Sequence, residues 1–79
     1  MTVNELHTKI VAAKRFLNSE VVKIRTTEEP SMLGFREIGD RLDLIHEVER
    51  IGIRNLGERD NRRIVRMLTD LDTYQTSNN

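Results

Sequence analysis

Four arginines near the carboxyl end of the chain could bind an anion: Arg59, Arg62, Arg63 and Arg66. On a helix, their spacing of three and four residues places all four side chains on one face. Guanidinium groups bind phosphates and carboxylates through paired hydrogen bonds. Like charges four residues apart disfavour an isolated helix by roughly 0.2–0.5 kcal/mol, and an anionic partner would offset that cost. We call these residues the arginine stripe.

Three interpretations of the arginine stripe are open. Glu58 precedes Arg62 by four residues and Asp70 follows Arg66 by four, so the stripe can be a solvated face neutralised by its own helix. It can also contact an acidic protein or a nucleotide, or the phosphates of duplex nucleic acid. The duplex is disfavoured, because 13 basic and 13 acidic residues give the chain no net charge. The residues at the start of this helix are also mostly uncharged or acidic, unlike those of a recognition helix: Asn55, Leu56, Gly57, Glu58 and Asp60.

Three carboxylates form a second charged group, the acidic strip, which consists of Asp40, Asp43 and Glu47. His46 follows Asp43 by three residues, a spacing that occurs at carboxylate-bridged metal sites in helical bundles. Such a site needs a matching motif on another helix, and the chain has none. We therefore expect a solvated or salt-bridged strip without a metal or a cofactor. The strip is the second candidate contact for a macromolecular partner.

No residues have the pattern of a catalytic or phosphate-binding motif. Ser19 and Ser31 lie in no nucleophile motif, the four glycines are scattered, and there is no cysteine. We expect a protein without catalytic residues that is not an enzyme and acts by binding.

The first element expected to position these groups is a long amino-terminal helix. Thr2 and Glu5 form a capping-box pattern, which predicts a helix from Val3 to Ile24 or Arg25. Its apolar residues recur at spacings of three and four and form what we call the seam: Val3, Leu6, Ile10, Ala13, Leu17, Val21 and Ile24. Such a line faces a partner helix through about six turns.

The partner of the seam can lie in the same chain or in a second copy. A chain of 79 residues makes one small domain, and such a domain buries only about 60% of its unfolded surface. Without cysteine it has neither disulfides nor thiolate metal sites to stabilise it. We therefore expect a homodimer or higher oligomer, formed through part of the seam or through surplus apolar surface on the second helix.

The second helix is expected to follow a break at Pro30, with Ser31 as a possible cap and a firm start near Phe35. Its apolar residues cover more than half of its circumference: Phe35, Ile38, Leu42, Leu44, Ile45, Val48 and Ile51. A helix this apolar is usually central to its domain. Gly52 is expected to end it in the left-handed conformation of a Schellman motif.

The third helix is expected to begin at one of two caps, Asn55 or Asp60, and to end near Tyr74. The polar residues 75–79 are expected to form a frayed tail. The predicted fold is therefore all-α, with residues 1–74 forming one domain in which a long helical hairpin is joined by a shorter third helix.

These observations favour a small interaction protein that oligomerises and regulates or assembles a macromolecular partner by binding its surface, as accessory regulators and inhibitors of phage or plasmid type do. The partner would be a protein, and the alternative is a regulator that binds nucleic acid or a nucleotide through the arginine stripe. No apolar run approaches the roughly 18 residues of a membrane span, and the start lacks the pattern of a signal peptide. We expect a cytoplasmic protein, in the host cytoplasm if phage-encoded, without a membrane partner.

Overall fold

Three α-helices and one short 3-10 helix make up the fold. The computed structural model describes residues 2–26 and 33–77. The elements are α1 (Val3–Thr26), α2 (Phe35–Ile51), the 3-10 helix η1 (Ile53–Asn55) and α3 (Glu58–Ser77). No described residue lies in a strand, which confirms the all-α class with three helices. With 20 residues, α3 is shorter than α1 but longer than the 17-residue α2.

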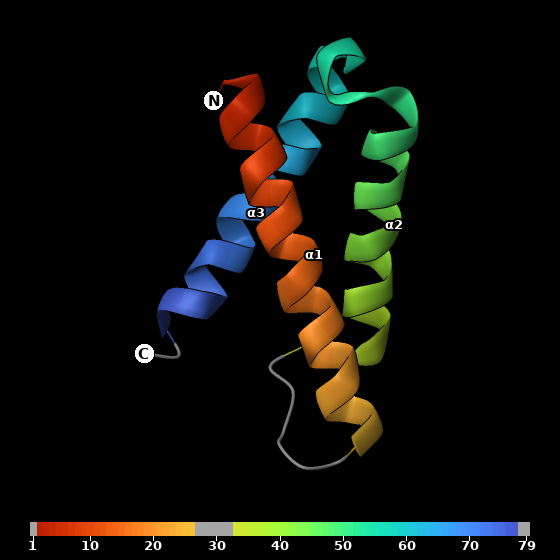
Figure 1. Ribbon diagram of the computed structural model, residues 1–79, viewed down its shortest axis with the longest axis vertical. Coiled ribbons are helices and arrows are strands. Elements are labelled where there is room, and N and C mark those ends of the chain that lie inside the picture. The colour runs from red at the N-terminus through yellow and green to blue at the C-terminus, as the bar shows by residue number, and fades with distance from the viewer. Residues whose placement is uncertain (1, 27–32, 78–79) are drawn as a thin grey trace.

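The helices pack as an antiparallel hairpin crossed by a third helix. Figure 1 shows α1 and α2 side by side with opposite directions, and α3 crossing α1 on the far side of this view. Each of the three helices contacts the other two. No helix in the described part of the chain has an apolar stretch long enough to cross a membrane.

The predicted start of α1 is confirmed, because the backbone N–H of Glu5 donates to Thr2 Oγ1 at 3.1 Å. Lys23 and Arg25 lie in its last turn, where positive charge interacts favourably with the helix dipole. The helix ends at Thr26, whose hydroxyl donates to the backbone carbonyl of Val22 at 2.9 Å. The observed end is thus one residue beyond the predicted Arg25.

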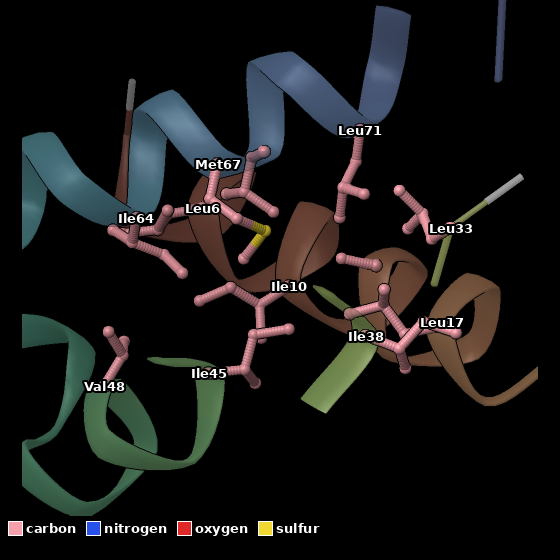
Figure 2. Packing of buried hydrophobic residues seen from close by; sticks show 12 residues of the cluster. Leu6, Ile10, Leu17, Leu33, Ile38, Ile45, Val48, Ile64, Met67 and Leu71 are labelled. Atoms are coloured by element: carbon pink, nitrogen blue, oxygen red, sulfur yellow. The ribbon is translucent and has the colours of Figure 1, made fainter. Parts of the chain in front are cut away.

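The seam of α1 lies in the core of a single chain. Its members Leu6, Ile10, Ala13 and Leu17 are buried, and Val21 and Ile24 are partly buried against the core. Figure 2 shows Leu6, Ile10 and Leu17 pointing towards apolar side chains of α2 and α3. Among the residues whose burial is described, the buried apolar ones are Leu6, Ile10, Ala13, Leu17, Leu33, Ile38, Ile45, Val48, Ile64, Met67, Leu68 and Leu71.

Four members of the seam pack against other helices of the same chain, as the first interpretation expects. Because these side chains are already buried against α2 and α3, a dimer through them would require the fold to open. Val3, at the start of the seam, remains 43% exposed.

One buried position on α1 is a carboxylate that the seam omitted. Glu20 is 1% exposed, and the Nζ atom of Lys23 lies 3.7 Å from its Oε1 atom. A strict alternation of three and four residues after Leu17 reaches Glu20 and then Ile24, whereas the sequence analysis had chosen Val21 for its apolar side chain. Val21 is only partly buried. The register of the helix therefore decides which residue faces inwards here. Burial of the Glu20 carboxylate is partly offset by its ion pair with Lys23.

The predicted start and end of α2 are confirmed, but the geometry of its end differs from the prediction. Gly52 has a φ of 97°, and its N–H donates to the carbonyl of Val48 at 2.9 Å. Its ψ of 129° is far from the left-handed helical value of a Schellman motif. The extended ψ directs the chain into η1 instead. The suggested cap Ser31 lies outside the described residues, and Gly34 occupies the cap position of the helix.

The start of α3 corrects the sequence analysis, because neither Asn55 nor Asp60 caps the helix. Gly57 directly precedes it, and the carbonyl of Gly57 accepts the N–H of Asn61 at 2.9 Å. Asn55 is the last residue of η1, and Asp60 already lies in the first turn of α3. Residue type favours Asn55 and Asp60 as caps, but the chain forms η1 directly after α2, and α3 begins only after η1 has ended. At its other end α3 runs to Ser77, so residues 75–77 are helical, and residues 78–79 lie outside the described part.

Candidate partner-binding surface

The acidic strip of α2 and the arginine stripe of α3 adjoin on one side of the molecule. All their side chains are exposed. A hollow of about 300 Å³ is lined by Asp40, Asp43, Leu44, Glu47 and Arg63. A second hollow, of about 370 Å³, is lined by Glu58, Arg59, Arg62 and the same Arg63. Arg63 therefore joins the two groups into one surface, to which Arg66 belongs as the next exposed arginine along α3 although it lines neither hollow. We call it the charged α2–α3 surface and define it as Asp40, Asp43, Glu47, Arg59, Arg62, Arg63 and Arg66.

Packing of α2 against α3 explains why these groups adjoin. The apolar faces of both helices turn into the same core, with Ile45 and Val48 on α2 and Ile64 on α3 fully buried. The polar residues of each helix are left on its outer side. Leu44 is half-buried at the boundary, beside Arg63 in the first hollow. Both charged groups are predicted from the sequence, but only as separate contacts.

Three ion pairs within the chain neutralise part of this charge. On α3, Arg62 pairs with Glu58, as the spacing predicted, and the Nη1 atom of Arg63 lies 3.5 Å from Asp60 Oδ1. On α2, the Nε atom of Arg50 donates to Glu47 Oε2 at 3.2 Å. Exposed pairs of this kind are screened by solvent and contribute little to stability, so they hold their side chains only weakly.

Four charges of the surface have no ion pair with any other described residue: Asp40, Asp43, Arg59 and Arg66. The expected neutralisation of Arg66 by Asp70 is not found. Two carboxylates and two guanidinium groups are thus exposed on adjoining helices and able to pair with charges on another molecule.

Arg50 and Arg63 stabilise the ionised form of Glu47. The pKa of Glu47 lies below its ordinary value of 4.5, first because of the hydrogen bond from Arg50 and then because of the positive charges of Arg50 and Arg63, which together outweigh desolvation. Since the folded-state pKa is lowered, the stabilisation from this group is present above its unfolded pKa and is lost as the pH falls through the folded value. The charge of Arg63 on α3 is thus one of the causes that lower the pKa of Glu47 on α2.

We predict that Arg50→Gln raises the pKa of Glu47 towards 4.5, because the hydrogen bond and the nearest positive charge are lost together. Arg63→Gln should raise it less, since Arg63 contributes only through its charge. A carbon-detected NMR titration of the Glu47 carboxyl measures both shifts. An unchanged pKa in Arg50→Gln would show that the pair does not persist in solution.

A third hollow, larger than these two, lies between the start of α1 and η1. It measures about 570 Å³, and its polar lining includes His7, Glu49 and Arg54. These residues are far apart in the sequence, so no spacing could have indicated that they meet. Lys14 donates to Glu49 at 3.1 Å and ties α1 to α2 beside this hollow.

Metal binding has no support among the described residues, where no three or more His, Cys, Asp or Glu side chains are arranged to hold an ion. Asp43, His46 and Glu47 do not form such a group. Their positions on one helix place them near one another, but a site needs ligands that converge.

The fold and the surface define a small all-α three-helix domain with a surface of mixed charge between its second and third helices. No protein-family model, no curated protein and no solved structure matches the chain.

Proposed function

We propose that this chain is a small, non-enzymatic interaction protein that acts in the cytoplasm and binds the surface of a protein partner through the charged α2–α3 surface. It would regulate or assemble that partner by occupying or bridging its surface. The observation that carries the proposal is a set of exposed charges on adjoining helices that form no ion pair with another described residue, with two carboxylates on α2 and two guanidinium groups on α3.

The mixture of charges favours a protein over a nucleic acid as the partner. Asp40, Asp43 and Glu47 adjoin the arginines and would repel phosphates that approach Arg63. Glu58 and Asp60 already pair with Arg62 and Arg63. A protein surface can present both signs of charge in a matching arrangement, which gives specificity as well as attraction.

The test is capture of partners by the immobilised chain from a nuclease-treated extract of its own cell, followed by binding measurements with the purified captured protein. We expect Arg59→Glu with Arg66→Glu to weaken that binding at least about tenfold, because two complementary charges become repulsive. The matched control is Arg15→Glu with Arg25→Glu, which reverses two exposed arginines of α1 and should bind as the unmodified chain does. Equal binding by all three proteins would contradict the proposal.

A labelled DNA duplex tests the alternative of a regulator that binds nucleic acid. On the proposed function, the duplex binds weakly or not at all at physiological salt. A tight complex whose affinity falls steeply with salt, and which Arg62→Glu with Arg66→Glu abolishes, would replace the protein partner with a nucleic acid.

A further inference from the structure

The charged α2–α3 surface has the arrangement of a self-complementary interface. Its negative groups lie on α2 and its positive groups lie on α3, and the two groups adjoin at Arg63. When a second copy faces this surface after a two-fold rotation, the acidic strip of each copy meets the arginine stripe of the other. Such an interface is isologous, because every contact occurs twice with the roles of the two copies exchanged.

We propose that a second copy of this chain binds at the charged α2–α3 surface and forms a two-fold dimer held by ion pairs between α2 of one copy and α3 of the other. The inference rests on the proposed function, since it names the chain itself as a partner of the same surface. Asp40 and Asp43 of one copy would face Arg59 and Arg66 of the other.

Charge complementarity favours a second copy as the occupant. The groups without an intramolecular ion pair match in number, with two carboxylates opposite two guanidinium groups in each half of the dimer. The chain has no net charge, so two copies do not repel each other at long range. Leu44, half-buried at the boundary of the two groups, supplies apolar contact near the two-fold axis.

Other routes to a dimer have less support. Four residues of the seam are buried in the core of their own chain. Phe35 at the start of α2 is 62% exposed, but nothing in the structure indicates what would cover it. A typical interface covers about 800 Å² of each partner, which is a small part of the 5684 Å² that the chain exposes. Because exposed ion pairs are individually weak and screened by salt, we expect a weak dimer that dissociates at high salt.

Charge reversal tests the dimer by its mass in solution, measured by sedimentation over a range of protein concentrations at low salt. The unmodified chain should reach twice its monomer mass of 9.2 kDa as concentration rises. Asp40→Lys with Asp43→Lys makes the acidic strip positive, and Arg59→Glu with Arg66→Glu removes the net positive charge of the arginine stripe. Each of these variants should stay monomeric, with a circular dichroism spectrum like that of the unmodified chain.

The decisive protein combines all four reversals in one chain. It again carries both signs on adjoining helices, with their positions exchanged, and its net charge equals that of the unmodified chain. We expect it to recover the dimer mass. Because its net charge is zero, recovery cannot result from non-specific attraction between oppositely charged molecules.

Two results would overturn this inference. A monomer mass for the unmodified chain at every concentration excludes the dimer. A dimer that both charge-reversed variants retain places the interface elsewhere. Neither result decides the proposed function, because capture of a different protein that depends on Arg59 and Arg66 would still support it. If the chain is monomeric and its captured proteins ignore those arginines, both the inference and the proposed function fail.

Discussion

Leu17→Asp should leave the chain largely unfolded at room temperature. Leu17 is completely buried on α1 and faces the core that includes Ile38 and Leu33. The substitution removes a buried leucine and places a carboxylate in an apolar environment, at a combined cost of about 4–5 kcal/mol or more. That cost is comparable to the whole stability of a small domain, which is about 5 kcal/mol at the low end of the usual range.

Thermal unfolding followed by circular dichroism measures this effect. Val22→Asp is the matched control, because Val22 lies on the same helix and is 57% exposed. We expect the control to change the free energy of unfolding by no more than about 0.5 kcal/mol. Equal melting temperatures for Leu17→Asp and the unmodified chain would show that the seam does not form the core.

Gly52→Ala and Gly39→Ala should change stability in opposite directions. At Gly52, a φ of 97° is unfavourable for any residue with a Cβ atom, and that atom would lie 3.2 Å from Asn55 Nδ2. We expect a loss of about 1–2 kcal/mol. Gly39 lies inside α2, where an added Cβ meets nothing within 4 Å. Alanine there should gain up to about 1 kcal/mol, because it has the higher helix propensity.

Thermal unfolding of the two variants beside the unmodified chain checks this pair of predictions. A shift of 1 kcal/mol corresponds to about 4–8 °C in melting temperature for a domain of this size, so both effects are measurable. A neutral Gly52→Ala would mean that the turn after α2 takes another conformation in solution. A destabilising Gly39→Ala would mean that this face of α2 is more tightly packed than the structure shows.

The presence of three helices and the buried face of α1 could be predicted from the sequence, because both depend on the periodicity of nearby residues. The spacing of Leu6, Ile10, Ala13 and Leu17 is sufficient to place these residues in a core. The same reasoning failed at Glu20, where it preferred the polarity of the side chain to the register of the helix. Following the register strictly would have identified the buried carboxylate.

The start of α3 could not be predicted in the same way. Asn55 is a good helix cap by residue type, but the extended ψ of Gly52 leads the chain into η1 and makes Asn55 its last residue. The helix then begins after Gly57, a residue with weaker capping chemistry. A cap is thus chosen by the path of the preceding turn as well as by its own side chain.

The charged α2–α3 surface was predicted as two groups of residues but not as one surface. Periodicity placed Asp40, Asp43 and Glu47 on one strip and the arginines on another. Whether two polar faces adjoin depends on how the turn at Gly52 and η1 sets α3 beside α2, and no local pattern contains that information. The two hollows that Arg63 lines show that the two faces adjoin.

Because the chain is small, we expect a second copy to stabilise it. The buried seam leaves less apolar surface for that contact, and we propose the charged α2–α3 surface in its place. The apolar seam is already buried within one chain, so its central residues stabilise the monomer. The charged surface is exposed and carries groups without an intramolecular ion pair. The proposed binding at this surface would not require the fold to open, so the binding and folding effects of substitutions should be separable.

The central claim is that binding occurs at the charged α2–α3 surface, and an NMR map of backbone amides tests it most directly. Spectra of the labelled chain are compared before and after addition of a purified partner, or between dilute and concentrated protein for self-association. The account predicts shift changes around Asp40, Asp43, Arg59 and Arg66, with the amides near Arg15 on α1 unchanged. Shift changes around Phe35 or around the hollow beside His7, without changes at the charged surface, would contradict this prediction.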